Sequence, residues 1–224
     1  MRHEDIEQKA REIQLEIWNR QTEIWPRNVP QLMDMFNVDS AAAVLGVRVE
    51  RFAYLPSYEK VGITRQIAGL IDREDGLIAL GMNFKPHIVK FTSAHELGHM
   101  VIHQDEVMHR DFPIEGLTQD QKRPPKEREA DHFAACFLMP RKLVKTLFRQ
   151  RFGDYVPFEV THATASMLRP HDPNSLLQED EDLAAILANA VRFNGRPFQS
   201  LASVFQVSTG CMAIRLKEIG LVRD

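Results

Sequence analysis

Two histidines and a glutamate at close spacing are the residues of this sequence best suited to chemistry. The string His-Glu-Leu-Gly-His occupies positions 95–99. Residues four apart in a helix lie on one face, so His95 and His99 can both reach one metal ion. Glu96 lies about 100° further round the helix, toward the position that a catalytic metal leaves open. The pattern predicts a zinc site with His95 and His99 as ligands and Glu96 as general base.

Such a site would hydrolyse a peptide bond. An amide is a poor electrophile, and water is a poor nucleophile near neutral pH. Zinc lowers the pKa of bound water to about 7 and polarises a carbonyl, while a carboxylate takes the proton and delivers it to the leaving amine. The alternative is a helix that carries two histidines and a glutamate by chance, and a third ligand of the right kind would argue against it.

A catalytic zinc site needs three protein ligands. His103 continues the spacing of four, but it lies eight residues from His95, which is about 12 Å along a straight helix. One ion cannot bridge that distance. We therefore expect His103 to pack against the site or to support a ligand.

The acidic residues of a second predicted helix, over residues 126–139, offer a better third ligand. At about 100° per residue, Glu127 falls inside the apolar sector of this helix, Asp131 at its edge and Glu129 outside it. A carboxylate that faces the core needs a partner, and zinc would supply one. Because Glu127 lies on the core-facing side of this helix and Glu129 does not, Glu127 is favoured over Glu129 as the ligand. Asp131 is placed to accept an imidazole N–H from a ligand histidine.

The N-terminal part of the sequence is typical of a structural scaffold. A helix over 3–25 carries apolar residues at spacings of three and four, namely Ile6, Ala10, Ile13 and Ile17. A short helix over 39–46 ends at Gly46, and the alternating residues 47–52 predict a half-buried strand.

The elements next to the histidines are predicted by turn residues and prolines. Apolar runs at 66–71 and 77–82 flank an Asp-Gly turn and predict an antiparallel hairpin. Pro86 can begin a helix that runs through His103. The polar, proline-containing residues 104–125 predict a loop over the site.

Residues 91–103 and 127–140 together resemble a known family. They look like the ImmA/IrrE zinc metallo-endopeptidases, whose second motif is Glu-x-x-Ala-(Asn or Asp)-x-Phe-Ala, ending in Leu-Met-Pro. In that family the glutamate of this motif is the third ligand, and it falls on Glu127. Phe137 departs from the usual aliphatic residue, which affects packing rather than chemistry.

The resemblance covers residues 66–140 and implies both fold and function. The fold class would be α+β, with a zincin-like peptidase core in which a small antiparallel sheet packs on the metal-binding helices. The substrate would be a protein, with helix-turn-helix repressors or antitoxins as the class to try first. The setting would be a bacterial or phage cytoplasm. The residue that stabilises the oxyanion is left open among His109, His132 and Tyr155.

Composition agrees with a cytoplasmic globular protein. The chain has 224 residues, with 44% hydrophobic and 26% charged residues, a formal net charge of −3 and a pI near 6.3. These values argue against a protein that coats nucleic acid or an anionic membrane. We find no apolar run of signal-peptide or membrane-spanning length. Cys136 and Cys211 are far apart, as expected of thiols in a reducing compartment.

The C-terminal residues predict a helical, helix-turn-helix-like subdomain. Residues 199–219 are typical of helix, turn and helix, with Ser208 as N-cap of the second helix. Few basic residues lie on that helix, which favours packing or partner docking over DNA binding. The runner-up function is nevertheless a DNA-binding regulator that uses 199–219 and has a structural or vestigial metal site. We expect four parts: a helix and strand section at 1–60, the zinc peptidase core at 61–152, a connector at 153–180 and the helical subdomain at 181–224.

Overall fold

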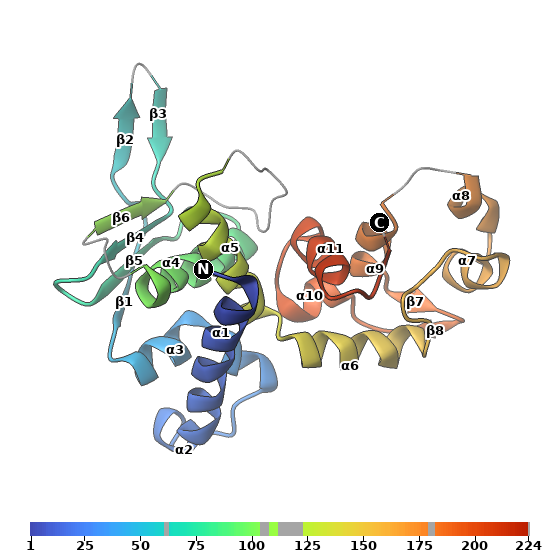
Figure 1. The fold of residues 1–224 in the computed structure, drawn as a ribbon, viewed down its shortest axis with the longest axis horizontal. Helices are drawn as coiled ribbons and strands as arrows, with labels where there is room; N and C mark the ends of the chain where they lie inside the picture. The colour runs from blue at the N-terminus through green and yellow to red at the C-terminus, as the bar shows by residue number, and fades with distance from the viewer. Residues whose placement is uncertain (61–62, 104–107, 112–122, 179–181, 224) are drawn as a thin grey trace. The chain divides into compact units, whose positions relative to one another are not determined.

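The computed structural model describes residues 1–60, 63–103, 108–111, 123–178 and 182–223, and it has a mixed α+β fold (Figure 1). The chain separates into two compact units, Met1–Leu138 and Met139–Asp224. The predicted α+β class is confirmed. The boundary between the two units lies between Leu138 and Met139, and the four-part division expected from the sequence stays a prediction.

The helix predicted over 3–25 forms as two helices, and the short helix predicted over 39–46 forms as one. Helix α1 (His3–Asn19) buries the four apolar residues of its stripe, and α2 (Gln21–Ile24) follows it. A 3-10 helix, η1 (Leu32–Phe36), precedes α3 (Val38–Leu45). Gly46 ends α3 with φ of +70°, a left-handed conformation that glycine adopts without steric cost.

The main sheet of the first unit has four strands in the order β1-β5-β4-β6. The predicted hairpin is confirmed, since β4 (Gly69–Asp72) pairs antiparallel with β5 (Leu77–Gly81). The predicted antiparallel sheet is corrected, because β1 (Arg48–Phe52) lies parallel to β5. A parallel pair needs a long crossover, and the 24 residues at 53–76 supply it.

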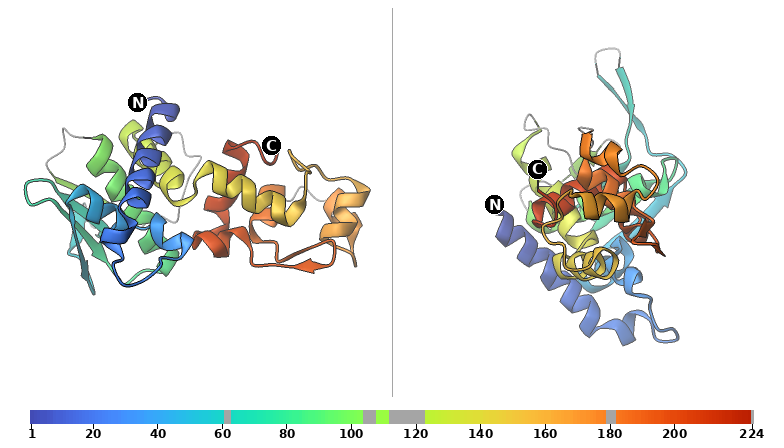
Figure 2. Two further views of the ribbon diagram at one scale, coloured as in Figure 1. Left: turned by 90° about the horizontal axis from the view of Figure 1, so that it is seen from below. Right: turned by 90° about the vertical axis from the view of Figure 1, so that its right-hand side faces the viewer.

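The predicted loop 104–125 is also corrected in part. Strand β6 (Met108–Asp111) pairs with the edge of β4, whereas 104–107 and 112–122 lie outside the described residues. The sequence of β6 has no apolar alternation, so the hydrophobic pattern does not predict this edge strand. Strands β2 (Ser57–Lys60) and β3 (Ile63–Gln66) form a separate antiparallel pair that extends away from the rest of the first unit (Figure 2).

Two helices carry the predicted site residues. Helix α4 (Pro86–Ile102) lies on the sheet, against β4 and β5, and α5 (Pro125–Leu138) lies along α4 (Figure 1). Helix α1 in turn packs on α5. Because α4 is covered by a sheet on one side and a helix on another, nearly its whole central segment is buried. Both helices begin at a proline, where the missing N–H has no intrahelical partner to lose.

The second unit is mainly helical. It contains α6 (Arg141–Phe152), α7 (His162–Leu168), α8 (Pro173–Gln178), α9 (Leu183–Asn189), the short pair β7 (Arg192–Phe193) and β8 (Arg196–Pro197), α10 (Leu201–Phe205) and α11 (Thr209–Glu218). Its core includes Phe152, whose ring meets those of Phe158, Phe193 and Phe198 edge-on.

The segment expected as an irregular connector, 153–180, contains two helices. The side chain of Thr161 accepts a hydrogen bond from the Thr164 backbone N–H and begins α7, a capping signal that hydrophobic periodicity does not detect. Helices α10 and α11 form where predicted, and Ser208 accepts from the Cys211 backbone N–H as the N-cap of α11. None of the described helices is long and apolar enough to cross a membrane.

Candidate metal centre

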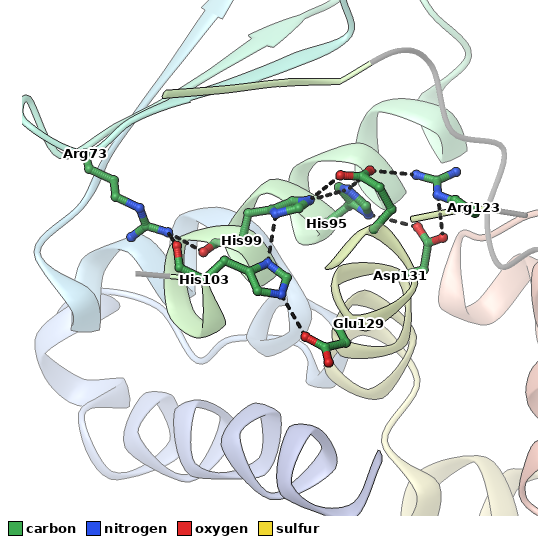
Figure 3. Close-up of polar contacts among 8 residues, drawn as sticks. Arg73, His95, His99, His103, Arg123, Glu129 and Asp131 are labelled. Atoms are coloured by element: carbon green, nitrogen blue, oxygen red, sulfur yellow. Dashed lines mark hydrogen bonds and ion pairs between the residues drawn. The ribbon is translucent and has the colours of Figure 1, made fainter. Parts of the chain in front are cut away.

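His95 and His99 lie one turn apart on α4, and their rings converge (Figure 3). The two Nε2 atoms are 3.0 Å apart, and both side chains are fully buried. A neutral imidazole keeps a lone pair on one ring nitrogen. The helix therefore brings two nitrogens of metal-ligand type to a single point.

Glu127 reaches the same point from the first turn of α5. Its two carboxylate oxygens lie 3.4 Å from His95 Nε2 and 3.4 Å from His99 Nε2. Ligand atoms of the three residues all lie within 4.8 Å of one another. The structure thus brings together the three residues that the sequence favoured as ligands, and they come from two adjacent buried helices.

Asp131 holds the ring of His95. Its Oδ1 atom is 2.8 Å from His95 Nδ1. When Nδ1–H donates a hydrogen bond to this carboxylate, the lone pair of the neutral ring is on Nε2, where it faces the donor cluster. This contact is the one expected for Asp131 from its place on the helix.

Arg123 supplies positive charge beside the acidic residues. Its Nη2 atom lies 3.3 Å from Glu127 Oε2, and its Nε atom lies 3.2 Å from Asp131 Oδ2. A guanidinium between two carboxylates reduces their mutual repulsion. Sequence reasoning missed Arg123 because it precedes α5 and belongs to no periodic pattern.

His103 and Glu129 contact the site without joining the donor cluster. His103 Nδ1 is 2.9 Å from His99 Nδ1, and His103 Nε2 is 2.9 Å from Glu129 Oε2. The other oxygen of Glu129 pairs with the amino group of Met1. Burial disfavours the charged form of Glu129, but hydrogen bonds from this amino group and from His103 hold the pKa of its carboxyl below the usual value. Glu129 is thus an ionised partner of His103.

Arg73, in the turn between β4 and β5, caps the end of α4 (Figure 3). Its guanidinium donates to the backbone carbonyls of His99, Met100 and His103; the last two distances are 2.8 and 2.6 Å. The His99 carbonyl also accepts from the His103 backbone N–H, whereas the last carbonyls of a helix lack such a partner. A cation there also interacts favourably with the helix dipole. The sequence predicted this turn but not the capping function of Arg73.

Gly98 explains the close approach of α4 and α5. A β-carbon at Gly98 would lie 3.1 Å from Phe133 Cδ1 and 3.2 Å from the backbone of Ala130. These distances are tighter than ordinary van der Waals contact, so a side chain here would push α5 outward. The glycine between the two metal-site histidines lets Glu127 come within reach of them.

None of the three candidate oxyanion stabilisers is assigned by the structure. His109 belongs to β6, whose side chains lie outside the described set. His132 stacks on His3 with ring centroids 4.2 Å apart, and its Nε2 is 3.5 Å from Cys136 Sγ, on the face of α5 that meets α1. Tyr155 belongs to the second unit, where its ring packs on Phe158 and Phe193.

The donor set fits a zinc ion. Two imidazole nitrogens and one carboxylate are ligands that catalytic zinc sites use, and they leave one coordination position open. Asp131 gives His95 the orienting partner that metal-bound histidines have in proteins.

Comparison with known proteins agrees with this site. Residues 59–167 match the family model Peptidase_M78, the IrrE N-terminal-like domain, and this match includes α4 and α5. No curated protein sequence matches the chain. The match supports a protein of the metallopeptidase class. A metallopeptidase requires a bound metal ion. More particularly, the resemblance to the ImmA/IrrE family noted from the motifs is confirmed over residues 59–167, just under half of the chain.

Proposed function

We propose that this protein is a cytoplasmic zinc-dependent endopeptidase that cleaves a regulatory protein. The observation that carries the proposal is the convergence of His95, His99 and Glu127 at one buried point, with Glu96 next to His95 on the same helix. The family match supports a metallopeptidase. The substrate class we propose, helix-turn-helix repressors or antitoxins, comes from the family resemblance of the motifs.

Each residue of the centre has a definite task in this proposal. His95, His99 and Glu127 would hold the zinc ion. When bound, zinc would act as a Lewis acid that activates water and polarises the scissile carbonyl. Glu96 takes the proton from the attacking water and delivers it to the leaving amine.

The neighbouring residues keep this machinery in place. Asp131 keeps the His95 ring oriented through the 2.8 Å contact at Nδ1. Gly69 leaves room for Glu96, because a β-carbon at that position would clash with the Glu96 side chain. Both residues would act on the reaction through the groups that they position.

The alternative function, DNA binding through residues 199–219, finds little support in the second unit. Arg215 on α11 is fully buried and donates to the Met139 carbonyl at 3.2 Å and to Glu218 at 3.1 Å. Lys217 pairs with Asp182 at 3.3 Å. Because these side chains serve contacts within the unit, they are poorly placed to neutralise phosphates.

The test is Glu96→Gln in the full chain, assayed against a panel of purified helix-turn-helix repressors and antitoxins. The wild type should cleave at least one of them, and a chelator should abolish cleavage. Glutamine keeps the shape but cannot accept the proton, so cleavage should fall by at least ~10²-fold. Elemental analysis should show unchanged zinc. Near-normal turnover by Glu96→Gln would refute the proposed mechanism, and a wild type that cleaves none of the panel would refute the substrate class.

A further inference from the structure

We propose that His103 and Glu129 are positioning residues that fix the ring of His99 so that its Nε2 lone pair faces the metal. This inference rests on the proposed zinc site. It assigns a task to Glu129, whose place on α5 was less favourable for a ligand than that of Glu127, and to His103, which is too far along α4 from His95 to share the ion.

The three residues form a continuous hydrogen-bonded chain that ends at the donor cluster (Figure 3). Glu129 Oε2 lies 2.9 Å from His103 Nε2, and His103 Nδ1 lies 2.9 Å from His99 Nδ1. His99 Nε2, on the far side of the ring, lies 3.0 Å from His95 Nε2 and 3.4 Å from Glu127. His99 is fully buried and His103 is only 5% exposed, so water has little access to replace these contacts.

The direction of the chain follows from its carboxylate end. The other oxygen of the Glu129 carboxylate pairs with the amino group of Met1, and Oε2 accepts from His103, which therefore carries a proton on Nε2. Neutral His103 then has a lone pair on Nδ1, which accepts a hydrogen bond from His99 Nδ1–H. His99 with its proton on Nδ1 has its lone pair on Nε2. The reverse arrangement would set the His103 Nε2 lone pair against a carboxylate oxygen, and it is therefore disfavoured.

The fold holds the chain at both ends. Arg73 donates to the backbone carbonyls of His99 and His103 and so fixes the last turn of α4. Glu129 lies two residues after Glu127 on α5, so the helix that supplies the third ligand also supplies the carboxylate for His103.

The result is one orienting carboxylate for each histidine ligand. Asp131 contacts His95 directly at 2.8 Å, whereas Glu129 acts on His99 through the ring of His103. Partners of this kind raise the basicity of a ligand histidine and restrict its rotation, and their loss costs about 10–100-fold in metal affinity.

Zinc affinity of the full-length protein, measured by competition with a zinc-binding dye, tests the proposal. His103→Phe keeps a ring but offers no acceptor, and we expect about 10–100-fold weaker binding. Glu129→Ala should weaken binding several-fold, whereas Glu129→Gln should bind nearly as the wild type does, because its amide oxygen still accepts from His103. Glu129 is 21% exposed, so its replacement should leave the fold intact.

A double variant separates positioning from general destabilisation. If Glu129 acts only through His103, the His103→Phe, Glu129→Ala double variant should bind zinc as weakly as His103→Phe alone. Nitrogen-15 NMR of the zinc-loaded wild type should show His99 protonated at Nδ1. Glu129→Ala with wild-type affinity, additive losses in the double variant, or a His99 ring protonated at Nε2 would each overturn the proposal. A wild type that binds no zinc would instead refute the proposed function.

Discussion

The backbone of Gly69 in β4 lies directly against the side chain of Glu96 in α4. A β-carbon at Gly69 would come within 2.7 Å of Glu96 Cγ and 2.8 Å of Thr92 Cγ2, and it would lie closer still to Glu96 Oε1. Real β-carbons do not approach other heavy atoms below 3.0 Å. Because Glu96 is fully buried, it cannot move away into solvent. The sheet thus constrains the position of the proposed general base.

We therefore expect Gly69→Ala to lower peptide cleavage by at least ~10-fold while zinc stays bound, because misplacing a reacting group by about 1 Å is costly. Cleavage rate and zinc content should be measured on the same preparation. Gly210→Ala is the matched control, since no atom lies within 4 Å of the added carbon. A Gly69→Ala enzyme with wild-type turnover would show that Glu96 is not constrained by β4.

Substitution of the three acidic residues of α5 should give a graded loss of zinc. Glu127→Ala removes a ligand and should abolish tight binding. Asp131→Ala removes the partner of His95 Nδ1 and should weaken binding by about 10–100-fold. Glu129→Ala acts through one more side chain and should have the smallest effect. Competitive titration with a zinc-binding dye gives the order of the three zinc affinities. If Glu129→Ala bound zinc most weakly, the assignment of Glu127 as a ligand would be wrong.

Arg73→Ala should destabilise the first unit. It removes the donor to the carbonyls of Met100 and His103 at the end of α4, whereas the His99 carbonyl keeps the His103 backbone N–H. An unsatisfied buried group costs about 1–3 kcal/mol, so the free energy of unfolding should fall by roughly 2–3 kcal/mol. Arg73→Lys keeps the charge but not the planar set of donors, and it should be intermediate. Denaturant titration of the wild type, Arg73→Ala and Arg73→Lys measures the free energy of unfolding of each. Equal values would rule out the capping function.

The partly buried amine of Lys90 on α4 makes the free energy of unfolding depend on pH in the alkaline range. Burial lowers the pKa of its amine to about 8, with a smaller opposing effect of Asp34. Between pH 8 and the ordinary lysine pKa the unfolded chain binds more protons, so the folded state gains stability as pH rises. Lys90→Met should stabilise the protein by about 1–2 kcal/mol at pH 7, and this gain should shrink by pH 10. Denaturant titrations at pH 7 and pH 10 measure this gain. Lys142→Met, on the exposed side of α6, is the control at both pH values. A gain that is the same at pH 7 and pH 10 would contradict the burial of this charge.

The local pattern of the sequence was enough to predict the helices of the site and the set of donors. The spacing of His95 and His99 depends only on helical geometry, and the rotation of α5 follows from its apolar stripe, which selected Glu127 and placed Asp131 beside a histidine. The same periodicity predicted the buried face of α1, and the Asp-Gly turn predicted the β4–β5 hairpin. These features follow from contacts between residues that are near in sequence.

Contacts between distant segments were decided only by the tertiary structure. Arg73 lies 26 residues before His99, and Gly69 has no pattern that relates it to Glu96, so neither contact could be derived from spacing. The parallel pairing of β1 with β5, the edge strand β6 and the chain from Glu129 through His103 to His99 depend on how the sheet and two helices pack. Hydrophobic periodicity determines which face of an element is buried, but it does not determine which element covers that face.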